Sequence, residues 1–377
     1  MRIACDARPL LGPRTGVGTW LEGLIRGLAA ATDWEFVLCL PRPVSGLGLE
    51  DLQGRCTVAA PPVAVSGTLW LTTLAGPLLA DGADVFVGTL GILPRRLQPP
   101  AALALHDLTP RTRPGHHTLA NRFCFNAYLE ESVLRADELV CSSEATRASL
   151  AVVLPQPARR ARVIPLAVDR FFSPPPDDEG PEATRARFAG GRPFVVQLGT
   201  LEPRKGIVTL LAAHARLLAR SDVSVDLVLA GKQGWGGGWL ERALAHHPQR
   251  DRVHLTGYVD RDGARALLRH AEVVVLASEE EGFGLPLVEA LACGAACVAS
   301  DAAALREVAA GAALHFSRAD EKALAAALEA ATEPARRVAL RTAARMRVSE
   351  LSWERAIAAW REVLARLRMA GDGSSRN

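Results

Sequence analysis

The sequence has a low net charge, no long uninterrupted apolar stretch and no dinucleotide-binding glycine motif, and each absence argues against a class of protein. Its formal net charge is only +3 over 377 residues, and no nucleic-acid-binding motif accompanies it, so we expect no nucleic acid partner. The most apolar long stretch, Val63 to Ala80, is broken by Ser, Gly, Thr and Pro and falls short of a membrane span. The dinucleotide-binding pattern is also absent: no strand is followed by a Gly-x-Gly-x-x-Gly motif and then, some twenty positions on, by an acidic residue. This argues against an NAD-dependent dehydrogenase.

Cysteine is scarce as well. Its seven copies, at positions 5, 39, 56, 124, 141, 293 and 297, are odd in number and include no Cys-x-x-Cys pair. This pattern argues for reduced thiols and a cytoplasmic location, and against a disulfide framework or a zinc site. The chain also starts directly on a strand pattern, Arg2 to Asp6, so we expect no signal peptide.

Lysine is the rarest charged residue, with Lys205, Lys232 and Lys322 as its only copies against forty-one Arg. A composition so biased toward Arg makes a retained Lys a candidate for a chemical role. The reason is that a compact ammonium and a broad, planar guanidinium are not interchangeable at a binding site.

Strand-like and helix-like patterns alternate along the chain, which predicts an α/β protein with parallel sheets and helices on both faces. A Pro-rich break over 171–192 predicts a linker between two domains of similar size, and we expect a disordered tail over 372–377. The expected strands are 2–7, 36–40, 85–88, 101–106, 139–142 and 162–166 in the first half, and 194–199, 226–231, 252–256, 273–277 and 297–300 in the second.

The most informative segment runs from Ser278 to Ala290. It follows an apolar run, Val273 to Ala277, that predicts a buried strand, and its glycines open a loop before a helix that begins near Pro286. A Gly loop between a strand and a helix N-terminus is an anion site, because free backbone N–H groups and the helix dipole point into it. Its carboxylates suit a ligand that also carries hydroxyls. A phosphorylated sugar fits both properties.

The same residues resemble glycosyltransferase family 4, whose signature is two Glu separated by seven residues around Gly-Phe-Gly-Leu-Pro. Glu281 and Glu289 fit that spacing. The resemblance continues through Ala292-Cys293-Gly294, then Val298-Ala299-Ser300-Asp301 and Leu305-Arg306-Glu307-Val308. It implies the GT-B architecture, which is two doubly wound Rossmann-like domains facing across a cleft that holds the active site.

The resemblance also implies how the chain divides. Residues 1–170 would form the N-terminal, acceptor-side domain, and a C-terminal helix over about 353–368 would pack back on it. Residues 193–352 would form the domain that binds the nucleotide sugar.

Several residues of the second domain are implied to bind the donor. Arg204 and Lys205 belong to a segment similar to the family motif Glu-Pro-Arg-Lys-Asn, with Gly206 in place of Asn, and would stabilise the departing diphosphate. Glu281 would hold the sugar and Glu289 the ribose. The other expected donor contacts in this domain are Gly199, Lys232, Gly257, Tyr258, Gly282, Phe283, Gly284 and Leu285.

The tripeptide Asp260-Arg261-Asp262 superficially matches the metal-binding Asp-x-Asp motif of a different glycosyltransferase fold. Its position before a helical run favours a helix cap instead. We therefore expect no catalytic metal and no cofactor besides the nucleotide sugar itself.

Three features of the first domain match the family less specifically. Gly16 and Gly18 lie at the mouth of the first helix, where the family places a glycine loop facing the donor phosphate, although close helix–strand packing also needs glycine. His106 ends an apolar strand, and the resemblance favours a catalytic contact with the donor sugar over a merely capped strand end. Ser142-Ser143 matches another family segment, but its Ser can equally cap a helix.

The resemblance implies a retaining glycosyltransferase that moves a sugar from a nucleoside diphosphate to an acceptor hydroxyl, with GDP-mannose as the favoured donor. Two alternatives are a GT-B nucleotide-sugar epimerase and a non-catalytic nucleotide-sugar-binding subunit. The acceptor would be a glycan or a lipid-linked glycan. A basic rim beside Ile92-Leu93 predicts peripheral membrane contact; its members are Arg95, Arg96, Arg111, Arg113, His116 and His117.

Overall fold

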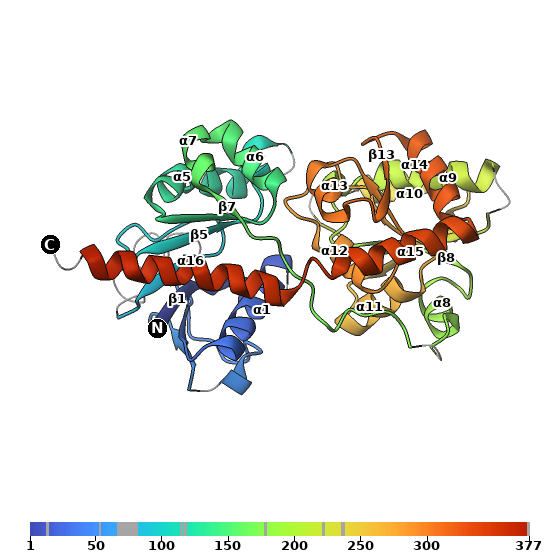
Figure 1. The fold of residues 1–377 in the computed structure, drawn as a ribbon. Coiled ribbons are helices and arrows are strands. Elements are labelled where there is room, and N and C mark those ends of the chain that lie inside the picture. The colour runs from blue at the N-terminus through green and yellow to red at the C-terminus, as the bar shows by residue number, and fades with distance from the viewer. Residues whose placement is uncertain are drawn as a thin grey trace. The chain divides into compact units, whose positions relative to one another are not determined.

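The chain folds into two compact α/β units (Figure 1). The computed structural model describes residues 1–12, 15–52, 54–65, 82–113, 115, 119–176, 179–220, 223–234 and 238–374. Unit 1 comprises Met1–Ala167 and Ser352–Asn377, and unit 2 comprises Val168–Leu351. Each unit is built on its own parallel sheet, which confirms the expected fold class.

Unit 1 contains a seven-stranded sheet with the strand order β3-β2-β1-β4-β5-β6-β7. Its strands are β1 (Arg2–Asp6), β2 (Glu35–Cys39), β3 (Cys56–Ala59), β4 (Val85–Gly88), β5 (Ala101–Leu105), β6 (Glu138–Cys141) and β7 (Arg162–Val163). Its helices are α1 (Gly16–Ala31), α4 (Thr109–Thr112), α5 (Leu119–Arg135), α6 (Glu144–Val153), α7 (Pro155–Arg160) and α16 (Trp353–Ser374).

Helix α16 returns to unit 1 and packs directly on α1 (Figure 1). Two glycines one turn apart make this approach possible. A Cβ atom at Gly23 would lie 2.1 Å from the Trp353 ring, and one at Gly27 would lie 2.5 Å from Ile357. Any larger residue at either position would therefore push the two helices apart.

Unit 2 contains a six-stranded sheet with the order β10-β9-β8-β11-β12-β13. Its strands are β8 (Phe194–Leu198), β9 (Asp226–Ala230), β10 (Val253–Gly257), β11 (Val273–Leu276), β12 (Cys297–Ser300) and β13 (Ala313–Phe316). Its helices are α8 (Glu182–Phe188), α9 (Ile207–Arg220), α10 (Trp239–Ala245), α11 (Arg261–His270), α12 (Leu285–Ala292), α13 (Ala303–Ala309), α14 (Glu321–Thr332) and α15 (Pro334–Val348).

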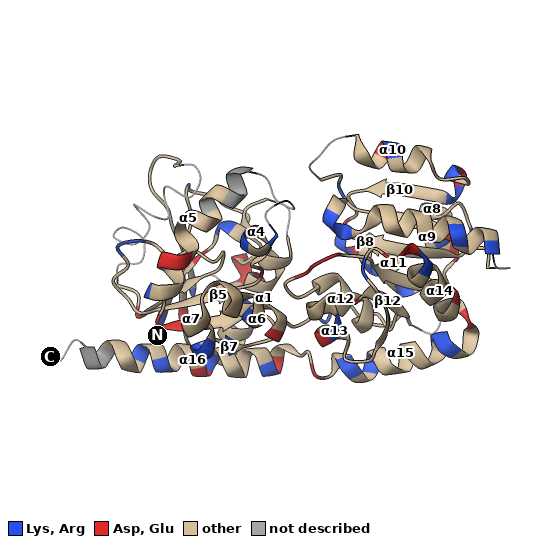
Figure 2. Ribbon diagram, turned by 90° about the horizontal axis from the view of Figure 1, so that it is seen from above, with Lys and Arg blue, Asp and Glu red and all other residues tan. Residues whose placement is uncertain are grey.

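The central strands of both units are apolar, as parallel strands covered on both faces must be. Helices α9, α10 and α14 share one hydrophobic core with the unit 2 strands. In Figure 2 the strands are mostly tan, and the blue and red of the charged residues lie mainly on helices and loops. In the part of the chain that the structure describes, no helix is long and apolar enough to cross a membrane.

The structure differs from the sequence-based expectation at two strands. The expectation omits β3, a four-residue edge strand whose side chains are half-buried or exposed, so it has no buried apolar run to mark it. It also omits β13, whose Ala-rich surroundings are typical of helices.

The ends of the predicted domains differ as well. The segment predicted as a linker over 171–192 belongs to unit 2 and contains helix α8, which packs against α11 and pairs Arg185 with Glu272 at 2.9 Å. The tail predicted as disordered from 372 continues helix α16 to Ser374, because each residue added to an existing helix gains a backbone hydrogen bond. Residues 375–377 lie outside the described residues.

A buried histidine pair links α9 to the segment after α10. His214 Nε2 lies 3.0 Å from the Val225 carbonyl oxygen, and His214 Nδ1 lies 3.2 Å from His247 Nε2. The Gln249 N–H donates to His247 Nδ1 at 3.2 Å. Because a carbonyl oxygen only accepts, each ring must carry its proton on Nε2, and all four nitrogens are satisfied only when both rings are neutral.

Acid is therefore expected to destabilise unit 2. Burial lowers the pKa of His214 from 6.5 to about 4, so its contribution is complete above pH 6.5 and is lost as the pH falls toward 4. Between roughly pH 7.5 and pH 5 this loss amounts to about 2 kcal/mol. Hydrogen exchange of α9 peptides across that range measures it.

The exposed neighbour His246 supplies the control. His246→Gln should keep the wild-type pH dependence, whereas His214→Phe should be less stable at neutral pH and should lose most of the acid response. An equal acid response in His214→Phe would show that other groups cause it.

Candidate active site

The candidate site lies where the strand order of the unit 2 sheet reverses. Strand β8 pairs with β9 on one side and with β11 on the other. The connections that follow β8 and β11 therefore lead toward opposite edges of the sheet. Open parallel sheets bind ligands at such a switch point, outside the carboxyl ends of the strands. The loop after β8 carries Arg204 and Lys205, and the loop after β11 carries Glu281.

These two loops are held together at their bases. The Gln197 side chain donates to the Lys205 carbonyl at 2.9 Å and accepts from the Ala277 N–H at 3.2 Å. The Glu279 N–H donates to the Arg204 carbonyl at 2.8 Å. Gly206, with a φ of 66°, lies so close to Ala277 that a Cβ atom would stand 2.0 Å from its carbonyl oxygen. The approach of the loops therefore requires glycine.

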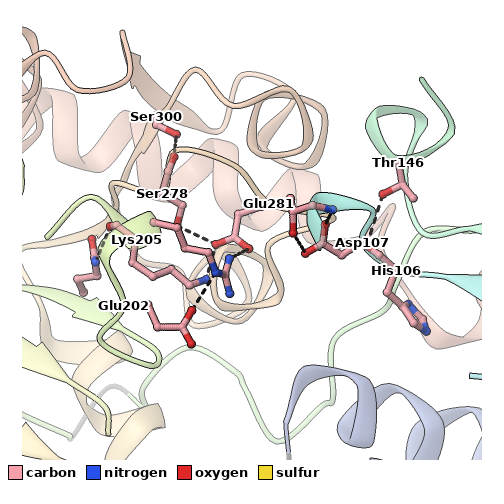
Figure 3. Close-up of polar contacts among 11 residues, drawn as sticks. His106, Asp107, Thr146, Glu202, Lys205, Ser278, Glu281 and Ser300 are labelled. Carbon is pink, nitrogen blue, oxygen red and sulfur yellow. Dashed lines mark hydrogen bonds and ion pairs between the residues drawn. The ribbon is translucent and has the colours of Figure 1, made fainter. Parts of the chain in front are cut away.

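The charged side chains of the two loops form one cluster (Figure 3). Lys205 Nζ lies 2.5 Å from Glu281 Oε1, and Arg204 Nη1 lies 3.7 Å from Glu281 Oε2. Arg204 Nε also donates to Glu202 Oε2 at 2.9 Å, and Ser278 Oγ donates to Glu281 Oε1 at 2.7 Å. Two cations thus share two carboxylates, and the cluster is close to electrically neutral.

Glu281 remains ionised although its carboxylate is largely removed from solvent. Burial alone would raise its pKa, but the charges of Lys205 and Arg204 and the hydrogen bonds from Lys205 and Ser278 bring the pKa below its usual value of 4.5. Its carboxylate is therefore an acceptor for sugar hydroxyls near neutral pH.

The glycine loop leads from Glu281 into helix α12. Gly284, with a φ of 94°, precedes the first helical residue Leu285, so the backbone of 282–284 lies at a helix N-terminus, as the sequence predicts. Phe283 is only 4% exposed, so its backbone is the part that can contact a ligand.

Glu289 lies one helical turn further along α12. Burial raises its pKa from 4.5 to about 7, Arg261 opposes the shift and Asp169 adds to it. Near neutral pH this carboxyl is therefore divided between its protonated and ionised forms.

Three glycines end the strands beside the cluster. Gly231 follows β9, and a Cβ atom there would stand 1.9 Å from the carbonyl oxygen of Gly199, which follows β8. Beside Gly199 and Gly257, by contrast, no described residue lies within 4 Å of the position of a Cβ atom. The space over these two strand ends is therefore open to a ligand.

Lys232 and Tyr258 meet next to these glycines. Lys232 Nζ lies 5.0 Å from the centroid of the Tyr258 ring, and the Tyr258 side chain is 60% exposed. The structure thus brings together two of the residues that the resemblance implies as donor contacts, with a cation over an aromatic face.

The Asp260-Arg261-Asp262 tripeptide caps a helix, as expected. Asp260 Oδ1 accepts from the Gly263 N–H at 2.7 Å and so caps α11, while Asp262 pairs with Arg265 at 2.8 Å. Within the described ranges, no group of three or more His, Cys, Asp or Glu residues is placed to hold a metal ion.

Unit 1 has its own switch point, between β1 and β4. Fully buried Asp6 at the end of β1 binds the Arg8 guanidinium through both oxygens, at 2.9 and 2.8 Å. Gly16 is the exposed first residue of α1. Gly18, two residues later in the same helix, is buried. Contacts of these glycines with a donor stay a prediction.

His106 follows β5 at the same sheet edge of unit 1. Its ring packs edge-on against Trp20, with the ring centroids 4.3 Å apart, and burial lowers its pKa from 6.5 to about 4. Both ring nitrogens are covered and find no hydrogen-bond partner within the described part of the chain. A contact with a donor sugar stays a prediction, and it would require this ring to move.

Two other expectations for unit 1 have different outcomes. Ser143 caps α6 through a 2.9 Å bond from the Thr146 N–H, so the capping alternative is correct. The apolar part of the predicted basic rim is wrong: Ile92 and Leu93 are 6% and 2% exposed, because the chain folds inward and the Leu93 N–H donates to Ser132. His116 and His117 of that rim lie outside the described residues.

Sequence reasoning missed the residues that support the cluster. Gln197 stands in an otherwise apolar strand, and a polar residue in a buried strand is a usable signal because it must find partners there. Glu202 and Ser278 lie within the recognised segments, but no local pattern indicates that they bind Arg204 and Glu281.

Gly206→Ala should separate the two loops. The new methyl group would collide with the Ala277 carbonyl, which cannot move without breaking the Gln197 bonds, so we expect a stability loss of about 1–3 kcal/mol and donor binding weakened at least about tenfold. Gly311→Ala is the matched control, since Gly311 has a φ of 91° but no described neighbour within 4 Å of a Cβ atom. Equal effects on donor binding would contradict the steric explanation.

Known proteins similar to this chain agree with the geometry. Residues 181–347 match the family model described as glycosyl transferases group 1. O-antigen chain mannosyltransferase B of Escherichia coli is 27% identical over 340 residues, which cover 86% of this chain and 89% of that protein. Serotype-specific mannosyltransferase WbdA of Escherichia coli is 31% identical over 242 residues, which cover 61% of this chain and 29% of that protein.

A solved structure shares the fold. The Anabaena protein Alr3699/HepE, in complex with UDP-glucose, has a TM-score of 0.74 at 19% identity, covering 97% of this chain and 99% of that chain. The expected GT-B class of fold is thereby confirmed. The family match includes the whole Arg204, Lys205 and Glu281 cluster, so residues 181–347 form a glycosyl transferases group 1 domain and the protein is a glycosyltransferase.

Proposed function

We propose that the protein transfers mannose from GDP-mannose to a hydroxyl group of a glycan acceptor, with retention of configuration, in polysaccharide or glycoconjugate biosynthesis. The observation that carries this proposal is the cluster in which Lys205 and Arg204 meet the ionised carboxylate of Glu281. The names of both mannosyltransferase relatives support mannose. The UDP-glucose bound to HepE supports a nucleotide sugar as the donor of this fold.

Donor binding would exchange the partners within the cluster. The diphosphate is a stronger partner for Lys205 and Arg204 than a single carboxylate, because it offers more charge and more acceptor oxygens. It would take over the two cations, and the released Glu281 carboxylate would accept hydrogen bonds from the sugar hydroxyls. One carboxylate thus balances the cations before the donor binds and orients the sugar afterwards.

The bond changes follow from this arrangement. The bond from the anomeric carbon to the diphosphate oxygen breaks, and its electron pair goes to the diphosphate, where Lys205 and Arg204 stabilise the charge. The acceptor oxygen bonds to the anomeric carbon from the same face and gives its proton to the departing phosphate oxygen. No residue needs to form a covalent intermediate, and the configuration is retained.

The donor can be identified by protection against thermal unfolding. A ligand at about one hundred times its Kd adds about 2.7 kcal/mol to the stability of the folded state, which raises the unfolding midpoint by about 5–11 °C for a domain of this size. We expect GDP-mannose to give this shift and UDP-glucose to give a smaller one. A larger shift with UDP-glucose would rule out the proposed donor.

The two halves of the cluster should respond differently to substitution. Arg204→Ala with Lys205→Ala removes the charges that bind the diphosphate, so affinity for GDP and transfer should fall together, by about 1.5–3 kcal/mol for each contact. Glu281→Gln removes the carboxylate that competes for those cations, so GDP should bind equally well or about threefold to tenfold more tightly. Transfer should nevertheless fall on the order of 100-fold.

Calorimetry with GDP beside a transfer assay separates these outcomes. Lys322→Ala is the control. Of the three lysines, Lys322 is the one outside the candidate site, and it is exposed on α14. Normal transfer by Glu281→Gln would refute its role at the sugar. Conversion of the donor without an acceptor would instead identify an epimerase.

A further inference from the structure

Two buried serines connect the Glu281 carboxylate to strand β12 (Figure 3). Ser278 lies two residues after β11, and Ser300 is the last residue of β12, which pairs with β11. Ser300 Oγ donates to the Ser278 carbonyl oxygen at 2.5 Å, and Ser278 Oγ donates to Glu281 Oε1 at 2.7 Å. The carboxylate is thus tied to the sheet by two hydrogen bonds in series.

Both hydroxyl groups have a fixed direction. A serine hydroxyl has a single hydrogen to donate, and here each is used for one of these two bonds. Ser278 is 2% exposed and Ser300 is 0% exposed, so water does not compete for either hydrogen. Ser300 is itself held from β13, because its carbonyl oxygen lies 3.0 Å from His315 Nδ1. Glu281 therefore has one partner whose position is set by the backbone of the sheet.

The partners of Glu281 differ in how a bound diphosphate would affect them. Within the described part of the chain, this carboxylate has three partners. Lys205 Nζ and Ser278 Oγ lie 2.5 and 2.7 Å from Oε1, and Arg204 Nη1 lies 3.7 Å from Oε2. A diphosphate would attract the two cations, whereas the Ser278 hydroxyl carries no charge. Ser278 would therefore stay on Oε1 and leave Oε2 to accept a hydrogen bond from the sugar.

We propose that Ser278, supported by Ser300, is a positioning residue for Glu281. It holds Oε1 in the free protein and continues to hold it when the donor has taken over both cations, so that Oε2 faces the sugar. The part concerning the donor rests on the proposed function, and the part concerning the free protein does not. Without this bond the released carboxylate would rotate, and a misplacement of about 1 Å can lower a rate on the order of 100-fold.

The contact in the free protein is tested first. Carbon-13 NMR of labelled Glu carboxyls, with Glu281→Gln to identify the signal, follows the titration of Glu281 without any ligand. Ser278→Ala should raise the pKa of Glu281, because it removes a hydrogen bond to the ionised form. Ser132→Ala is the matched control. Ser132 is also 2% exposed, but it lies on α5 of unit 1, where its Oγ accepts from the Leu93 N–H, so this variant should leave the titration unchanged.

Turnover supplies the second measurement. Ser278→Ala should lower kcat for transfer from GDP-mannose about tenfold to a hundredfold. Its affinity for GDP, measured by calorimetry, should stay unchanged, which also shows that unit 2 is folded. Ser300→Ala should lower kcat by less, because it acts only through Ser278. Glu281→Ala removes the group that Ser278 positions, so adding Ser278→Ala to it should cause no further loss. Alanine is used because a Gln amide oxygen could still accept the Ser278 bond.

The outcomes separate this inference from the proposed function. An unchanged Glu281 titration in Ser278→Ala, a full additional loss of kcat in the double variant, or an equal loss in Ser132→Ala would each overturn the inference. No transfer from GDP-mannose by the wild-type protein, with the titration shift of Ser278→Ala intact, would refute the proposed donor and support the role of Ser278 in the free protein.

Discussion

The pairing of β8 with β11 is the constraint on which the candidate active site depends. It brings side by side two loops whose key residues, Lys205 and Glu281, are 76 positions apart in the chain. The Gln197 side chain then bonds to both loops, and Gly206 lets them approach within van der Waals distance of backbone. The short ion pair of the cluster is a consequence of this backbone arrangement, because neither charged side chain could otherwise reach its partner.

The electrostatics of the site follow from the same arrangement. Burial alone would raise the pKa of Glu281. The charges of Lys205 and Arg204 bring that pKa below its usual value instead, so the carboxylate stays ionised between them. Glu289 shows the opposite case on the neighbouring helix. It forms no ion pair with a described residue, and removal of its carboxyl from solvent raises its pKa to about 7.

The fold was predictable where local patterns are strong. Buried strands such as β8 and β11 have continuous apolar runs, and the α1 helix has a clear apolar face, so their existence and type follow from the sequence. Edge strand β3 and helix α8 lack such patterns, because their side chains remain partly exposed and their stability comes from tertiary packing. The Pro-rich composition around α8 therefore predicted a linker where the chain in fact packs against α11.

The sequence by itself determined which chemical groups are available: the Glu281 and Glu289 pair, the adjacent Arg204 and Lys205, and the glycine loop before a helix. These signals are local, since each lies within a dozen residues. Only the tertiary structure decided which groups meet, and hence that Lys205 pairs with Glu281 and that Gln197 bonds to both loops. The physical reason is that strand order and helix packing set the distances between loops, and neither can be deduced from the spacing of residues along the chain.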